Sequence, residues 1–344
     1  MTHFVVIGGG SWGAAIASSL QRAQQPVTVL VRGQQTVDML AQGRCPKLTD
    51  CAPIKPLTAT TDHNCLATAT MIFVAVPVQA NAESFDIINT MQANAPPAIV
   101  ALCAKGIVSH NEGSAMLLTT LAQTMIPRHK VVVFSGPSFA DEVFSGLPAA
   151  LVAAGIESAT KAIQSAFEGS NLRVYRNTDS VGVALAGAMK NVIAIAAGCA
   201  VGLGLGDNAK AAILTRGLSE IARFSSVLGA KSDTVFGLAG VGDLALTCAG
   251  PHSRNMAFGM ALGRGEAPSD QLAEGSRTVA ALAHLAAHHH IDVPITNAVD
   301  KLVNHGEDLH QIVAGLLARP AHTCLLYTSP SPRDLSTSRM PSSA

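Results

Sequence analysis

The stretch FVVIGGGSWGAAIASSL, residues 4–20, places four β-prone apolar residues, three consecutive glycines and an alanine-rich segment in direct succession. A strand that leads through a glycine turn into a helix is the context in which the pattern GxGxxG binds a dinucleotide. The first glycine permits the tight turn, the second leaves room for a pyrophosphate, and the third lets the helix approach the strand. A glycine turn without a ligand is the alternative. The cofactor-binding residues predicted here are Gly8, Gly10, Ser11, Trp12 and Gly13.

The residue after the second strand bears on the choice of cofactor. That strand is VTVLV, residues 27–31. An acid about 20 residues past the glycines would accept a hydrogen bond from the ribose 2′-OH of NAD. Arg32 stands there instead, and Asp38 lies too far along. Because an arginine suits the 2′-phosphate of NADP, we expect NADP or NAD as the cofactor; an exposed surface arginine is the alternative.

Strand-like runs alternate with helical segments over roughly the first 135 residues. Runs such as MIFVAV (71–76), IVALCA (99–104) and KVVVF (130–134) are continuously apolar, which is typical of parallel strands covered on both faces. Residues 140–178 resemble further strands and a helix that complete the sheet. The sequence therefore predicts an α/β protein whose N-terminal domain, residues 1–178, is a Rossmann-type, doubly wound, mostly parallel sheet.

From about residue 180 the apolar residues recur at helical spacing, so we expect an all-helical C-terminal domain over residues 179–323. One apolar stretch, 181–203, is long enough to span a bilayer. Lys190 lies at its middle, where a lysine costs about 2.5–3.5 kcal/mol in a membrane, so a buried helix of a soluble domain is expected. The helical stretches expected are 181–203, 208–229, 254–263, 276–290 and 294–305.

The two ends of the chain differ from this pattern. Residues 324–344 are rich in Ser, Pro, Thr and Arg without periodicity, which is typical of a disordered tail. CLLYTSPSPRD within them also resembles translated sequencing adapter, so we expect this tail to be disordered or non-native. The start lacks a basic segment followed by a long apolar one, so no signal peptide is expected.

Composition excludes several kinds of partner. The chain has 23 basic and 23 acidic side chains, so no positive surface for nucleic acid is expected, and no membrane contact is predicted. The seven cysteines are scattered without a CxxC pair, which is typical of reduced thiols in a cytoplasmic protein. The run His288, His289 and His290 has no Cys or acid at ligand spacing, so we expect a solvated helix end and no metal site.

Six blocks, in their order and spacing, resemble the bacterial-type NAD(P)-dependent glycerol-3-phosphate dehydrogenases. They are GGGSWGAAIA, CAKGI, SGPSFADEV, AGAMKNVIAIAAG, GLAGVGDLALTC and SRNMAFGMALGRG. The likeness covers essentially residues 3–320. It implies reduction of dihydroxyacetone phosphate to sn-glycerol 3-phosphate, the precursor of glycerophospholipids, with a nicotinamide supplying the hydride.

The candidate catalytic residues are two lysines, Lys190 and Lys105, together with Asp243. Lys190 lies among small and apolar residues, where burial would lower its pKa enough for proton exchange near neutral pH. Lys105 follows a predicted strand at the sheet edge where ligands bind, where it can polarise a carbonyl and depress the pKa of Lys190. The resemblance implies that Lys190 donates the proton to the substrate carbonyl and that Lys105 contacts substrate and cofactor. Ordinary surface lysines are the alternatives.

Other candidates follow a strand or a glycine loop. Gly136 and Ser138, after the strand 130–134, present donors at the same sheet edge, although a plain turn is the alternative. The resemblance implies that these two contact substrate and that Ala140 lies near the cofactor. Asp243 follows a glycine loop and is a candidate N-cap of the next helix. The resemblance implies that it binds substrate or steers the catalytic lysine.

The remaining candidates lie around the block SRN. Ser253 can cap a helix, and Arg254 and Asn255 offer donors for a phosphate; a capped helix with a surface arginine is the alternative. The resemblance implies that Thr247 contributes a hydroxyl to the substrate site and that Arg254 and Glu274 lie near the cofactor.

Two other functions stay open. A hydroxyacid or 6-phosphogluconate-type dehydrogenase has the same architecture with a central lysine, but its carboxylate substrate would not need SRN. A protein that senses NADP without chemistry belongs to a different class. The sequence leaves open the preference between NAD and NADP, the oligomeric state including a homodimer, and feedback regulation.

Overall fold

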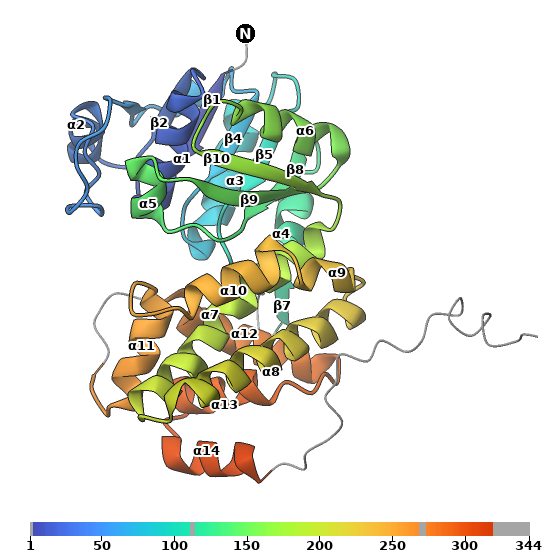
Figure 1. Ribbon diagram of the computed structural model, residues 1–344. Coiled ribbons are helices and arrows are strands. Elements are labelled where there is room, and N and C mark those ends of the chain that lie inside the picture. The colour runs from blue at the N-terminus through green and yellow to red at the C-terminus, as the bar shows by residue number, and fades with distance from the viewer. Residues whose placement is uncertain (1–2, 111–113, 268–272, 319–344) are drawn as a thin grey trace, which may run out of the picture.

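A sheet half and a helical half make up the computed structural model, which describes residues 3–110, 114–267 and 273–318 (Figure 1). In Figure 1 the sheet lies above the helices. The tail expected at residues 324–344 lies outside the described residues.

The sheet has eight strands in the order β10-β9-β8-β5-β4-β1-β2-β3. Every neighbouring pair is parallel except β8 and β9, so the predicted mostly parallel sheet is confirmed. The strand order reverses at β1: β2 and β3 lie on one side of it, and β4, β5 and β8 lie on the other. In such folds ligands bind in the crevice at this point of reversal. The strands are β1 (Phe4–Ile7), β2 (Val27–Leu30), β3 (Thr58–Thr60), β4 (Met71–Val74), β5 (Ile99–Leu102), β8 (Lys130–Ser135), β9 (Ala149–Ala154) and β10 (Leu172–Asn177).

Helices cover both faces of this sheet. Because side chains alternate along a strand, β4 places Phe73 in one apolar cluster and Ile72 and Val74 in the other. Phe73 also packs against Phe134 and Phe167, with ring centroids 5.6 and 5.7 Å away. The helices of this half are α1 (Ser11–Arg22), α2 (Gln34–Ala41), α3 (Asn81–Met91), α4 (Leu118–Met125), α5 (Ala140–Ser145), α6 (Glu157–Ala166) and the 3₁₀ turns η1 (His63–Leu66) and η2 (Val78–Ala80).

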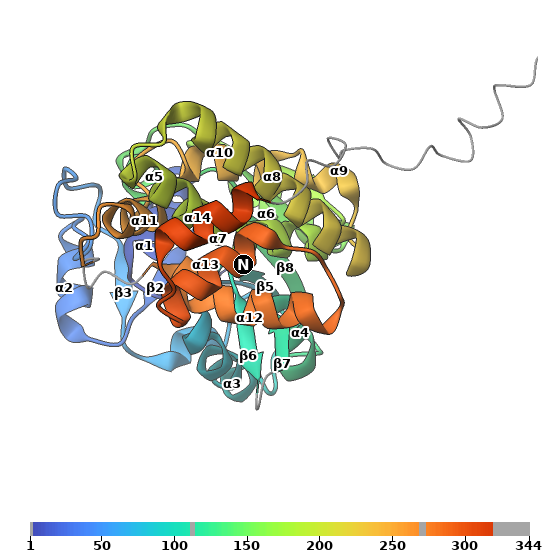
Figure 2. The same ribbon diagram turned by 90° about the horizontal axis from the view of Figure 1, so that it is seen from below.

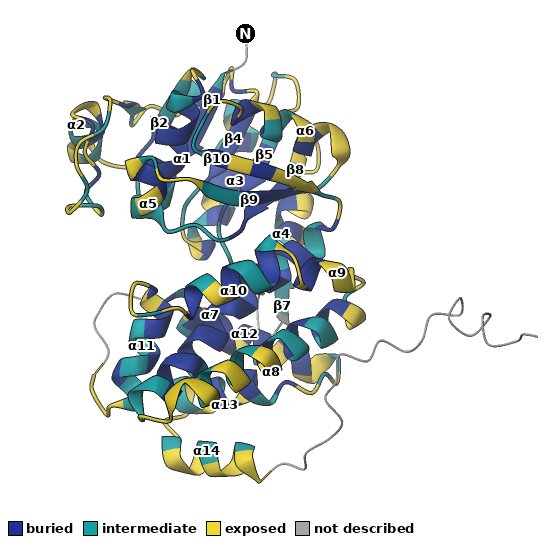
Figure 3. Cartoon of the chain, in the orientation of Figure 1, coloured by how far each residue is buried: buried dark blue, intermediate teal, exposed yellow. Residues whose placement is uncertain are grey.

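The helical half is built around α7. This helix is long and apolar enough to cross a membrane, but 89% of its most apolar window is buried inside the protein. In Figure 3 most of α7 has the colour of buried residues. The expected buried helix is therefore confirmed, and the five predicted helical stretches correspond to α7, α8, α11, α12 and α13. The elements are α7 (Ser180–Gly202), α8 (Gly206–Val227), α9 (Ser232–Val235), the π-helical turn η3 (Leu238–Gly242), α10 (Asp243–Thr247), α11 (Arg254–Gly263), α12 (Glu274–His288), α13 (Pro294–Asn304) and α14 (Leu309–Leu317).

Glycines allow α7 and α11 to pack backbone against backbone. Gly198 and Gly202 of α7 face Gly259 and Gly263 of α11, and each pair is spaced by one helical turn. A Cβ atom at Gly259 would clash with the carbonyl oxygen of Ile195. This contact sets how closely the start of α11 approaches the middle of α7.

A hairpin that the sequence did not indicate leaves the sheet half and packs on the helices. It consists of β6 (Ile107–His110) and β7 (Ser114–Leu117), paired antiparallel between β5 and α4. Ile107 and Leu117 belong to the apolar cluster of the helical half, and the hairpin lies beside α12 (Figure 2). The segment between β5 and this hairpin contains Lys105, so the hairpin helps to fix that lysine relative to the helices.

The glycine contact predicts a stability effect. Gly259→Ala should lower the free energy of unfolding by about 1–3 kcal/mol, because the added methyl group must force the two helices apart. Denaturation with urea measures the change. Gly315→Ala on α14 is the control, since a Cβ there meets nothing within 4 Å. Equal effects of the two substitutions would show that the close approach is not required.

Candidate active site

The glycine turn after β1 has the geometry of an anion cradle. Gly8 has φ +111°, and a Cβ there would lie 2.7 Å from the carbonyl oxygen of Ala75. Gly10 is the N-cap of α1 and has no side chain to cap the helix, and a Cβ atom there would meet nothing within 4 Å. The first amides of α1 lack intrahelical acceptors, so the turn offers donors and open space to a phosphate. The indole Nε1 of Trp12 is buried without a hydrogen-bond partner. These features fit the pyrophosphate of a dinucleotide.

Asp243 brings together one lysine from each half of the protein. Lys105 follows the carboxyl end of β5, Lys190 lies in the middle of α7, and Asp243 is the first residue of α10. Lys190 Nζ lies 2.5 Å from Asp243 Oδ1, and Lys105 Nζ lies 2.7 Å from Asp243 Oδ2. The structure therefore confirms that the two predicted lysines converge.

All three charges are largely removed from water. The side chains of Asp243, Lys190 and Lys105 are 1%, 9% and 15% exposed. Burial lowers the pKa of Lys190 to about 8, the nearby Lys105 ammonium lowers it as well, and Asp243 acts in the opposite direction. Burial would raise the pKa of Asp243, but the two lysines together bring it below its usual value. The site therefore holds an ionised carboxylate and an amine that can exchange a proton close to neutral pH.

Further polar groups fix the two ammonium groups in place. Lys190 Nζ also donates to Thr247 Oγ1 at 2.9 Å, and this hydroxyl donates to the carbonyl oxygen of Asp243 at 2.6 Å. Lys105 Nζ donates to the carbonyl oxygen of Gly136 at 3.2 Å, which also accepts from Ser138 Oγ at 3.1 Å. The strand end at β8 is thus part of the same cluster.

The predicted N-cap role of Asp243 is wrong. The π-helical turn η3 continues directly into α10, and the N-cap position is taken by Gly242 in helical conformation without a side-chain cap. The carboxylate is therefore free to accept from the two lysines. Ser253, in contrast, is the expected cap of α11 and accepts from the amide of Met256 at 3.4 Å.

Asn191, which directly follows the catalytic candidate Lys190, is not among the predicted site residues. Asn255 Nδ2 donates to Asn191 Oδ1 at 3.0 Å, and Asn191 Nδ2 donates to Glu274 Oε2 at 3.2 Å. Asn255 Oδ1 accepts from the amide of Gly275 at 2.9 Å. This chain of amides joins α7, α11 and the start of α12 next to Lys190. The sequence pointed to Asn191 only through its position directly after Lys190.

The other candidates lie outside this hydrogen-bonded cluster. Arg254 is exposed at the start of α11. Ala140 begins α5 and packs against the core of the sheet half. Arg32 is exposed and pairs with Glu83. At the end of α12, His288 and His290 are exposed and His289 is half-buried. Within residues 3–110, 114–267 and 273–318, no group of three or more His, Cys, Asp or Glu side chains could hold a metal ion.

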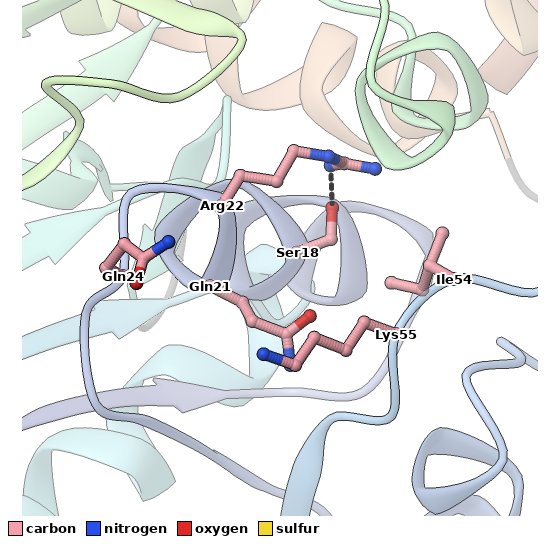
Figure 4. Close-up of a pocket in the computed structure, with 6 residues that line it drawn as sticks. All are labelled: Ser18, Gln21, Arg22, Gln24, Ile54 and Lys55. Atoms are coloured by element: carbon pink, nitrogen blue, oxygen red, sulfur yellow. Dashed lines mark hydrogen bonds between the residues drawn. The ribbon is translucent and has the colours of Figure 1, made fainter.

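Two cavities lie outside the cluster. One of about 200 Å³ is on the outer side of α1, where Arg22 donates to Ser18 at 2.9 Å (Figure 4). Another of about 510 Å³ lies between β9, β10 and η3. Neither is lined by Lys105, Lys190 or Asp243.

Comparisons with known proteins agree with this architecture. Residues 3–161 match the family model for the N-terminus of NAD-dependent glycerol-3-phosphate dehydrogenase, and residues 179–314 match the model for its C-terminus. A Mesorhizobium japonicum protein named glycerol-3-phosphate dehydrogenase (NAD(P)+) is 39% identical over 322 residues, covering 92% of each chain. An Agrobacterium fabrum protein of the same name is 40% identical over 326 residues, covering 93% of this chain and 98% of that protein.

A solved structure is also similar over nearly the whole chain. The crystal structure of glycerol-3-phosphate dehydrogenase from Coxiella burnetii is 35% identical with a TM-score of 0.85. The match covers 92% of this chain and 99% of that one.

The buried ion cluster predicts a pH-dependent stability defect. Asp243→Asn should lower the free energy of unfolding at pH 7 by about 3–5 kcal/mol, because it leaves two largely buried ammonium groups without a counter-charge. The pKa of Lys190 is lowered in the folded state and should fall further in the variant, since Asp243 raises it. The defect should therefore shrink as the pH rises from 7 through about 8, the pKa of Lys190 in the unmodified protein, and then stay level. Above that pH both proteins gain stability in parallel up to the pKa of an unfolded lysine, at about 10.4. Urea denaturation at pH 7 and at about pH 9.5 measures both values.

Asp207→Asn is the matched control, since Asp207 pairs with Lys210 at 2.7 Å on the exposed surface of α8. We expect little change at either pH. A defect of Asp243→Asn that is small or independent of pH would contradict the proposed charge balance.

Proposed function

We propose that this chain, which belongs to the family of NAD-dependent glycerol-3-phosphate dehydrogenases, interconverts dihydroxyacetone phosphate and sn-glycerol 3-phosphate with NAD or NADP. The observation that supports this most directly is the buried cluster in which Asp243 bridges Lys105 and Lys190. A bound nicotinamide supplies or accepts the hydride, and the protein provides position, charge and the proton.

Lys190 is the proposed proton donor to the substrate carbonyl and the acceptor in the reverse reaction. Its pKa of about 8 is close to the pH at which a general acid works best. Asp243 and Thr247 orient its amine through two hydrogen bonds. Lys105 places a second positive charge beside the carbonyl oxygen, where it favours the charge that develops during reduction.

The phosphate of the substrate is proposed to bind at the start of α11. Arg254 offers a planar set of donors there, and the amides that follow Ser253 add the positive end of a helix. Asn255 is held by Asn191 and Gly275, so it contributes mainly to positioning and has one amide hydrogen left for a ligand. Gly136 and Ser138 are the proposed contacts from the sheet half.

The cofactor is proposed to lie along the carboxyl edge of the sheet. The glycine turn, with Ser11 and Trp12, would hold the pyrophosphate, and Arg32 would contact the adenosine ribose. Ala140, Arg254 and Glu274 are proposed for the nicotinamide end, together with Lys105. We propose that residues 1–178 form the cofactor-binding domain and residues 179–323 the substrate-binding domain.

We further propose that the protein works in the cytoplasm, in the supply of glycerol phosphate for phospholipids. All six cysteines within the described residues are free thiols, which suits a reducing compartment. Burial raises the pKa of Cys65 to about 11 and those of Cys199 and Cys248 to about 12, so these thiols stay protonated and unreactive.

Initial rates test the proposed reaction. Dihydroxyacetone phosphate should be reduced with NADH or NADPH, and oxidation of glycerol 3-phosphate should exceed that of 3-hydroxy acids and 6-phosphogluconate by orders of magnitude. Dihydroxyacetone without its phosphate should be a poor substrate, because Arg254 would have no partner. Equal rates with glycerol 3-phosphate and a hydroxy acid would overturn the assignment in favour of a related dehydrogenase.

Lys190→Ala tests the catalytic role. We expect kcat to fall about 100-fold or more, as for loss of a general acid, with little change in the Kd of the cofactor. Lys161→Ala, on the exposed face of α6, is the control and should leave kcat unchanged. Unaltered turnover in Lys190→Ala would remove this lysine from the mechanism, and absence of turnover in the unmodified protein would favour an NADP-sensing role.

A further inference from the structure

Arg32 has a partner that could not be inferred from its position in the sequence. Its Nη2 donates a hydrogen bond to Glu83 Oε2 at 2.9 Å. Arg32 follows β2 by two residues, whereas Glu83 lies in the first turn of α3, 51 residues further along the chain. The residues directly after β2 include no acid, and the fold brings Glu83 of α3 to that place.

Arg32 and Glu83 follow the two strands that flank β1, the strand that leads into the glycine turn. Strand β1 is flanked by β2 and β4, and the carboxyl end of β1 at Ile7 aligns with Leu30 and with Val74. Arg32 comes after the first of these neighbours, and the helix that contains Glu83 comes after the second. In dinucleotide-binding folds the residue after the second strand contacts the adenosine ribose, where NAD has a 2′-OH and NADP a 2′-phosphate.

Because their charges are opposite, Arg32 and Glu83 favour different groups at the ribose, the 2′-phosphate of NADP and the 2′-OH of NAD. The side chains of Arg32 and Glu83 are 78% and 64% exposed, so their ion pair is weak and easily opened. A 2′-phosphate would compete with Glu83 for the guanidinium and would be repelled by the carboxylate. A ribose hydroxyl, in contrast, can donate a hydrogen bond to that carboxylate.

We propose that Glu83 is a specificity-determining residue of the cofactor site. Its carboxylate favours the 2′-OH of NAD and disfavours the 2′-phosphate of NADP, while Arg32 acts in the opposite direction. The inference rests on the proposed function, because it requires a dinucleotide at the glycine turn.

Binding measurements on the full-length chain test the proposal without relying on turnover. The Kd values for NAD+ and NADP+ are measured by isothermal titration calorimetry, with quenching of Trp12, the single tryptophan, as a second readout. Glu83→Gln should shift the ratio of the two affinities toward NADP+ by about tenfold or more, since a like charge next to the phosphate is removed. Arg32→Ala should shift the ratio toward NAD+.

Glu157→Gln is the matched control, because Glu157 is also an exposed glutamate that pairs with an arginine, Arg176, at 3.5 Å. It should leave the ratio unchanged. A ratio in Glu83→Gln equal to that of the control, with both nucleotides still bound, would overturn the role of Glu83 and leave the proposed function intact. Failure of the unmodified protein to bind either nucleotide would instead overturn the proposed function and this inference with it.

Discussion

The carboxylate of Asp243, held between two ammonium groups, is the interaction on which the arrangement of the site depends. Lys105 comes from the sheet half and Lys190 from the central helix of the other half, so the two lysines would repel each other without the shared counter-ion. Two cations to one anion leave an excess of positive charge in a largely buried place. Such a site favours a substrate that carries negative charge, and it keeps one amine near the pKa needed for proton transfer.

Packing far from the charges sets the position of this site. The glycines of α7 and α11 let the two helices approach closely, and the same approach brings Asn191 within 3.0 Å of Asn255. The amide of Asn255 in turn fixes the start of α12 through Gly275. The groups proposed to read the phosphate and to donate the proton are therefore held on helices whose spacing is fixed by their backbones.

The fold and the two lysines could be predicted because their signals are local. Continuous apolar strands, the glycine turn and the apolar spacing of five helices are read within short windows of sequence, and Lys105 lies at a strand end where ligands bind. The geometry of Asp243 could not be predicted, because the π-helical turn before it determines that its carboxylate faces the lysines instead of capping α10. The contact of Glu83 with Arg32 depends on the order of β2, β1 and β4 in the sheet, which no local pattern encodes.

The hairpin β6–β7 makes the two halves interdependent. Ile107 and Leu117 are buried among side chains of the helical half, while Val108 packs against the sheet half. If the sheet half were separated from the helices, Ile107 and Leu117 would be exposed to water. Lys105 would also lose its ion pair with Asp243. The two halves therefore depend on each other for stability, because each supplies part of the apolar surface that buries the hairpin.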